Sequence, residues 1–211
     1  MSRISLFRPF LIFLGILFFA GCTASHPTSF YVLTGKTSGG ESAGSMAQSE
    51  TCPRLELASV SFPEYLDRSE IVTRVGPNRL GLSELHHWAE PLRENFVRVL
   101  RANLNSRLCG GNIVVFPERR RTRSDYRLRV YVHRFETLER DRALLTASWT
   151  FRDAQSGKVL RTRRVVYEPP VKGADHQAVV AAMSKALASL SRDIGDSFLE
   201  IAGESRQKGD I

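Results

Sequence analysis

Apolar residues recur at helical spacing in two long segments of the chain. One segment carries Trp88, Leu92, Phe96, Val99, Leu100, Leu104 and Leu108, and the other carries Val179, Met183, Leu187, Leu190, Ile194, Phe198 and Ile201. Steps of three and four place such residues on one face of a helix. We therefore predict one helix over residues 88–108, with Pro91 in its first turn and Gly110-Gly111 after its end, and another over residues 175–202. The second stripe is also heptad-like, so it fits either packing on a sheet or contact with another helix between subunits.

Alternation of apolar and polar residues predicts strands elsewhere. In residues 125–136 the apolar side chains Tyr126, Leu128, Val130 and Val132 share one side, and a phase slip at Arg134-Phe135 predicts a bulge. Residues 143–153 and 159–168 complete a meander of three antiparallel strands. Shorter strands are expected at residues 30–33, 54–63, 70–76, 78–84 and 113–117. The expected fold class is α+β, a mostly antiparallel β-sheet with two long helices packed on one face, over residues 54–203 and followed by a polar tail at 204–211.

The most apolar run, residues 10–20, is too short to span a membrane. Its eleven residues would reach about 16 Å as a helix, roughly half of a hydrocarbon core. Arg3 and Arg8 precede the run and Ala20-Gly21-Cys22 follows it. This order is typical of a bacterial lipoprotein signal, so we predict that residues 1–21 are removed and that Cys22 carries the lipid.

An ordinary signal peptide with a coincidental cysteine is the alternative to lipidation of Cys22. Thr23, rather than Asp, follows the cysteine. By analogy with enterobacterial sorting, this favours the outer membrane over the inner membrane. Residues 22–53 would then form the lipid-anchored N-terminus, with a short strand and a flexible loop rich in Ser and Gly at 34–50.

The compartment changes how the charge and the cysteines are interpreted. The formal net charge is +8, or +6 once Arg3 and Arg8 are removed with the leader. Outside the inner membrane this excess indicates anionic lipid or an acidic protein rather than nucleic acid. The densest basic cluster, residues 118–123, contains the candidates for such a contact, Arg119, Arg120, Arg121 and Arg123; a solvated loop is the other interpretation.

Lipidation of Cys22 leaves an even pair of cysteines. Cys52 and Cys109 would stand in an oxidising compartment, where a disulfide between them is favoured. Two unpaired cysteines too far apart to meet are the alternative.

The sequence offers no pattern of catalytic chemistry. It contains no nucleophile elbow, no paired metal-ligand motif and no Cys-x-x-Cys. His86 and His87 are adjacent, and adjacent residues on a helix point about 100° apart. We therefore expect no enzyme activity, no cofactor and no metal site.

Residues 62–104 carry a more specific pattern. It consists of Pro63, Tyr65, Leu66, Asp67, Arg68, Ile71 and Val72, then Asn78, Arg79 and Leu80, then Trp88, Ala89, Glu90, Pro91 and Leu92. This pattern resembles the PqiC-type ABC transport auxiliary lipoproteins. The segments Asp125-Tyr126-Arg127, Phe135-Glu136 and Leu145–Trp149 are similar to the same family, whereas the insert at 34–50 is longer than expected.

The resemblance implies a non-enzymatic subunit of an envelope lipid-transport system. Such a lipoprotein would dock a periplasm-spanning MCE-domain assembly at the outer membrane, as a ring of identical subunits in one version. Pro63, Tyr65, Leu66, Asp67 and Arg68 are then candidates for partner contact. A monomeric carrier holding an acyl chain between sheet and helices is the second hypothesis. It needs an apolar cavity of several hundred Å³, whereas Trp88, Phe96, Trp149 and Phe151 could fill the core themselves.

Overall fold

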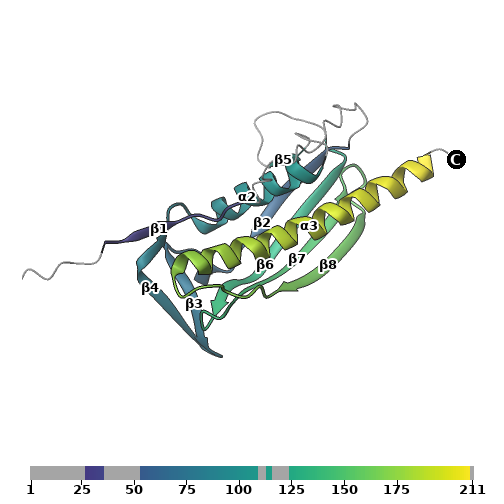
Figure 1. The fold of residues 1–211 in the computed structure, drawn as a ribbon. Coiled ribbons are helices and arrows are strands. Elements are labelled where there is room, and N and C mark those ends of the chain that lie inside the picture. The colour runs from purple at the N-terminus through teal and green to yellow at the C-terminus, as the bar shows by residue number, and fades with distance from the viewer. Residues whose placement is uncertain (1–26, 36–52, 109–112, 116–123, 210–211) are drawn as a thin grey trace, which may run out of the picture.

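The computed structural model describes residues 27–35, 53–108, 113–115 and 124–209, which form one layer of sheet and one of helices (Figure 1). The elements in chain order are β1 (Ser29–Tyr31), β2 (Leu55–Ser61), the 3₁₀ turn η1 (Glu64–Leu66), β3 (Glu70–Gly76), β4 (Arg79–Trp88), α2 (Leu92–Arg107), β5 (Ile113–Val115), β6 (Tyr126–Leu138), β7 (Arg142–Asp153), β8 (Val159–Tyr167) and α3 (His176–Gly209).

Strand β6 is the centre of a mixed sheet. Along one edge it pairs antiparallel with β7, which in turn pairs antiparallel with β8. Along its other edge it pairs in parallel first with β2 and then with β3, so these two strands lie end to end. Strand β5 joins β2 in parallel, β4 joins β3 antiparallel, and β1 joins β4 in parallel. The α+β prediction and the three-stranded meander are confirmed, while the parallel pairings were not predicted.

The alternation expected in β6 is present, and so is its bulge. Val132 pairs with Ala147 and Arg134 pairs with Thr146, which leaves His133 as the extra residue. Before the bulge Tyr126, Leu128, Val130 and Val132 are buried. After the bulge Phe135 enters the core and Glu136 falls on the opposite face of the sheet, because successive strand residues point to opposite sides.

Both described helices pack on one face of the sheet and close the core (Figure 1). Phe96 of α2 meets Phe62 and Phe135 edge to face, and Phe198 of α3 contacts Tyr126 and Phe151. The whole predicted stripe of α3 is buried. This helix has 34 residues, which corresponds to about 51 Å of length, and it continues through residues 204–209 of the expected polar tail.

The start of α2 differs from the sequence prediction. Trp88 is the last residue of β4, and the helix begins at Leu92 after the N-cap Pro91. Trp88 lies four residues before Leu92, so its spacing imitates the helical stripe. Proline disfavours helical backbone in the residue before it, which excludes residues 88–90 from the helix. Strand β4 therefore extends to Trp88 and contains His86 and His87, so the geometry of this pair is that of a strand rather than of a helix.

Strand β8 leaves one edge of the sheet open. Among the described strands it pairs with β7 only. Three of its nine residues are arginines, Arg161, Arg163 and Arg164. Arg161 turns toward α3, where it pairs with Glu200 and Glu204.

Candidate functional site

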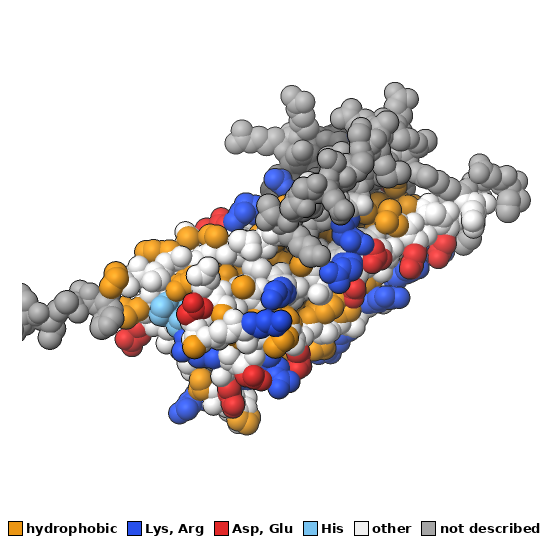
Figure 2. Space-filling model, in the orientation of Figure 1, with side chains coloured by type: hydrophobic (Ala, Val, Ile, Leu, Met, Phe, Trp, Pro, Cys, Tyr) orange, Lys and Arg blue, Asp and Glu red, His pale blue; other side chains and the backbone are white. Residues whose placement is uncertain are grey.

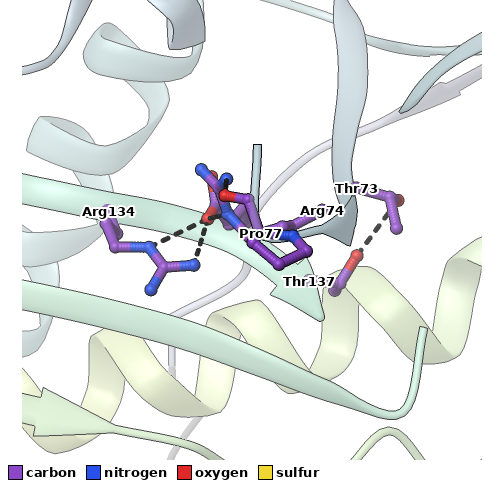
Figure 3. Close-up of polar contacts among 6 residues, drawn as sticks. Thr73, Arg74, Pro77, Arg134 and Thr137 are labelled. Atoms are coloured by element: carbon purple, nitrogen blue, oxygen red, sulfur yellow. Dashed lines mark hydrogen bonds and ion pairs between the residues drawn. The ribbon is translucent and has the colours of Figure 1, made fainter. Parts of the chain in front are cut away.

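A buried carboxylate joins three segments of the chain on the sheet face opposite the helices. Glu136 of β6 is fully buried and accepts hydrogen bonds from Arg74 of β3, at 2.6 Å, and from Arg134 of β6, at 2.7 Å. Arg74 also donates to the backbone oxygen of Pro77. Figure 3 shows both arginines beside the hydrogen bond between Thr73 and Thr137 that ties β3 to β6.

The two arginines keep Glu136 ionised. Burial by itself would raise the pKa of this carboxyl, but the hydrogen bonds from Arg74 and Arg134 outweigh it and the pKa lies below its ordinary value. The opposite shift occurs at Tyr65, where burial and then the neighbouring Glu136 raise the pKa of the phenol. Tyr65 thus brings the connection between β2 and β3 against the carboxylate.

That connection contains the five residues predicted to contact a partner. Leu66 is 2% exposed and belongs to the core, so its side chain is not accessible in this structure. Pro63 and Tyr65 are half-buried, and Asp67 and Arg68 are exposed. The Nε of Arg68 donates to the backbone oxygen of Tyr65 and steadies the turn. The structure therefore leaves Asp67 and Arg68 as the two fully accessible side chains of the set.

The Trp-Ala-Glu-Pro-Leu segment has a structural role at the start of α2. Trp88 and Leu92 are buried. Glu90 accepts hydrogen bonds from the side chains of Asn95 and Arg98. Asn95 in turn accepts the backbone N–H of Leu33 at 2.7 Å. These contacts fix the segment after β1 to the helix.

A second polar cluster joins β1 and β4 to the start of α3. The rings of His86 and His176 stack with their centroids 3.5 Å apart. The Tyr31 hydroxyl lies 2.9 Å from Nδ1 of His86, and the Ser83 hydroxyl lies 2.9 Å from Nε2 of His176. Burial, then the charge of Arg140 and the neighbouring His86, lower the pKa of His176 to about 4. His176 is therefore neutral at pH 7, and the cluster has a structural role in which it attaches the start of α3 to β1 and β4.

Several residues singled out from the sequence lie outside the described residues. They are Cys22, Cys52, Cys109, Arg119, Arg120, Arg121 and Arg123. Lipidation, the disulfide and the basic-cluster contact remain predictions. Within the described ranges, the acidic, histidine and cysteine side chains form no group that could hold a metal ion. The described helices also include none with the length and hydropathy needed to cross a membrane.

The comparison with protein families decides the classification. Residues 31–195 match the family described as the ABC-type transport auxiliary lipoprotein component. The chain belongs to this family. Its members are described as transport components rather than as enzymes, so the chain is a transport-associated lipoprotein. No match was found among curated proteins.

Solved structures support the fold of this auxiliary lipoprotein. Protein XCC0632 from Xanthomonas campestris is 22% identical, with a TM-score of 0.64 over 85% of this chain and 99% of the other. A second crystal structure, described as an uncharacterized protein, is 21% identical, with a TM-score of 0.65 over 82% of this chain and 99% of that one. At these identities the likeness establishes the fold alone.

Proposed function

We propose that this lipoprotein docks a periplasm-spanning MCE-domain assembly of a Pqi-type lipid transporter at the outer membrane. The observation that carries the proposal is the match to transport auxiliary lipoproteins across residues 31–195. The lipid on Cys22 would hold the domain at the membrane, and the folded domain would bind the transporter protein. Neither role requires catalysis.

The packed core favours docking over the alternative of a lipid carrier. Phe96, Phe135, Trp149 and Phe151 are among the largest side chains with less than 2% exposure. They occupy the layer between the sheet and the helices, where a carrier would hold an acyl chain. Rings in mutual contact, such as Trp149 with Phe151 at 5.4 Å, fill this space with protein atoms.

Co-purification of the full-length chain tests the proposal. The tagged chain is extracted from membranes in mild detergent and captured, and the captured proteins are identified by mass spectrometry. Recovery of an MCE-domain protein is the expected result. Recovery of an isolated monomer with bound phospholipid would instead support the carrier and contradict docking.

A pair of charge exchanges tests the exposed part of the β2–β3 connection. Asp67→Lys with Arg68→Glu reverses both exposed charges without changing the net charge. We expect it to reduce recovery of the MCE-domain protein by about tenfold, which corresponds to about 1.4 kcal/mol of binding free energy. The matched control is Arg93→Glu with Glu94→Lys, which exchanges two adjacent exposed charges on α2. Equal recovery with both variants would exclude residues 67 and 68 from the contact.

A further inference from the structure

The sheet face opposite the helices presents an ordered array of polar side chains. The strand registers place Ser61, Tyr131, Ser148 and Arg164 in one row across β2, β6, β7 and β8. The next row consists of Ser59, Arg129, Thr150 and Thr162. A third row begins with Glu56, Arg127 and Arg152. Both described helices pack on the other face, so they do not cover these rows. We call this array the open sheet face.

Positive charge dominates the open sheet face. Its three rows and the Glu136 cluster contain six arginines, Arg74, Arg127, Arg129, Arg134, Arg152 and Arg164, against two carboxylates, Glu56 and Glu136. Farther along the same face, Arg142 is paired with Glu168. Within the described residues, no carboxylate lies at ion-pair distance from Arg129, Arg152 or Arg164. On the helix side, by contrast, basic and acidic side chains are interspersed (Figure 2).

Tyr131 stands among these cations with half of its side chain, 51%, exposed. Its ring lies 4.7 Å from the ring of His133, which lies 3.0 Å from the Ser148 hydroxyl. Arg129 is its neighbour along the same face of β6, and Arg164 lies in its own row. Exposed tyrosine and arginine are the residue types enriched at the energetic centres of protein interfaces.

The open sheet face continues into the β2–β3 connection. Tyr65 of that connection lies against Glu136, which belongs to the same side of the sheet. Asp67 and Arg68 are exposed beside it. The combined surface therefore contains exposed carboxylate, hydroxyl and aromatic groups as well as arginines. An anionic membrane would repel the carboxylate, whereas a protein surface can complement a mixture of groups with an acidic majority opposite the arginines.

We infer that the open sheet face is the surface that binds an acidic face of the transporter's partner protein, with Tyr131 as an aromatic anchor between Arg129 and Arg164. This inference rests on the proposed docking function and adds its location and chemistry. The arginines steer the acidic partner to this face and make association dependent on salt. Tyr131 supplies the apolar contact that arginines alone lack.

Charge reversal on this face, with a matched control on the helix layer, tests the inference. The detergent-extracted full-length chain is captured as above in three forms: the natural chain, Arg129→Glu with Arg164→Glu, and Arg93→Glu with Arg101→Glu on the exposed side of α2. The two variants change net charge equally. We expect the sheet-face variant to lower recovery of the MCE-domain protein by about tenfold or more at 150 mM salt, while the α2 variant retains it.

Tyr131→Thr provides a second variant that keeps strand propensity and removes the ring. We expect it to lower recovery as well and to reduce the salt dependence less than the arginine variant does. Thermal unfolding of each variant shows that the domain remains folded.

The outcomes separate this inference from the proposed function. If the natural chain recovers no MCE-domain protein, docking itself fails and the inference fails with it. If the natural chain and the sheet-face variant recover it equally, docking stands and the inference is overturned. If the α2 variant loses as much recovery of the MCE-domain protein as the sheet-face variant does, the effect comes from net charge alone and the inference is overturned. If the sheet-face variant loses binding to vesicles containing 30% phosphatidylglycerol but still recovers the partner, the face binds the membrane instead and the inference is overturned.

Discussion

Glu136 is the buried carboxylate that Arg74 and Arg134 share on the sheet face opposite the helices. Replacing it by glutamine leaves Arg74 and Arg134 without their common carboxylate. Both guanidinium groups are partly exposed, at 22% and 38%, so water can take over part of the interaction. We expect Glu136→Gln to lower the free energy of unfolding by about 2 kcal/mol at pH 7.

Chemical denaturation measures the effect of this substitution, with Glu84→Gln at an exposed position of β4 as the control. The folded pKa of Glu136 is depressed, so its contribution is present above the unfolded value of about 4.3 and is lost as the pH falls further. The difference between the natural chain and Glu136→Gln should therefore shrink below about pH 4. A difference that is constant with pH would contradict this account.

At the scale of the element, the attachment of α3 to the sheet depends on an uncharged histidine. His176, the first residue of α3, faces His86 and Tyr31 from β4 and β1, Arg140 from the β6–β7 turn, Ser83 from β4 and Asp175 before the helix. Its pKa falls from 6.5 in the unfolded chain to about 4. The unfolded chain therefore binds the proton more strongly between these two pH values.

The free energy of unfolding should decrease as the pH falls from about 6.5 to about 4, by at most about 1.4 kcal/mol per pH unit from this group. His176→Asn should flatten that stretch of the profile. His87→Asn is the control. His87 is the residue after His86 in β4, and its ring contacts Phe30 edge to face rather than His176. Denaturant titrations at pH 7.0, 5.5 and 4.5 compare the three proteins. An unchanged slope in His176→Asn would exclude His176 as the source.

The regular elements were predictable because their patterns are local. The alternation of β6, its bulge and the stripe of α3 each follow from side-chain spacing within one segment. The end-to-end pairing of β2 and β3 along β6 depends on contacts between distant segments, and no spacing encodes it. The Glu136 cluster was missed for the same reason. The phase slip at Arg134-Phe135 was the one local signal of this cluster. The slip places Glu136 on the sheet face opposite the helices, where it is buried.

At the scale of the whole molecule, two covalent features remain predictions, the lipid on Cys22 and a disulfide between Cys52 and Cys109. Cys52 lies three residues before β2, and Cys109 lies four residues before β5. These strands are paired in parallel, with Leu55 opposite Ile113, so the two strands begin at the same end of the sheet. We expect a disulfide between Cys52 and Cys109, which would add on the order of 4 kcal/mol of stability. Alkylation of the unreduced protein followed by mass spectrometry should find both thiols blocked, and label on both would exclude the bond.

The arginines on the open edge of β8 limit how copies of this lipoprotein can aggregate. If many copies share a membrane, an open strand edge is a template on which identical strands can add to one another. Two β8 edges paired antiparallel about their middle would place Arg163 of one copy opposite Arg163 of the next, with Arg164 close by. This repulsion would oppose fibre-like association between neighbouring copies while leaving the open sheet face free.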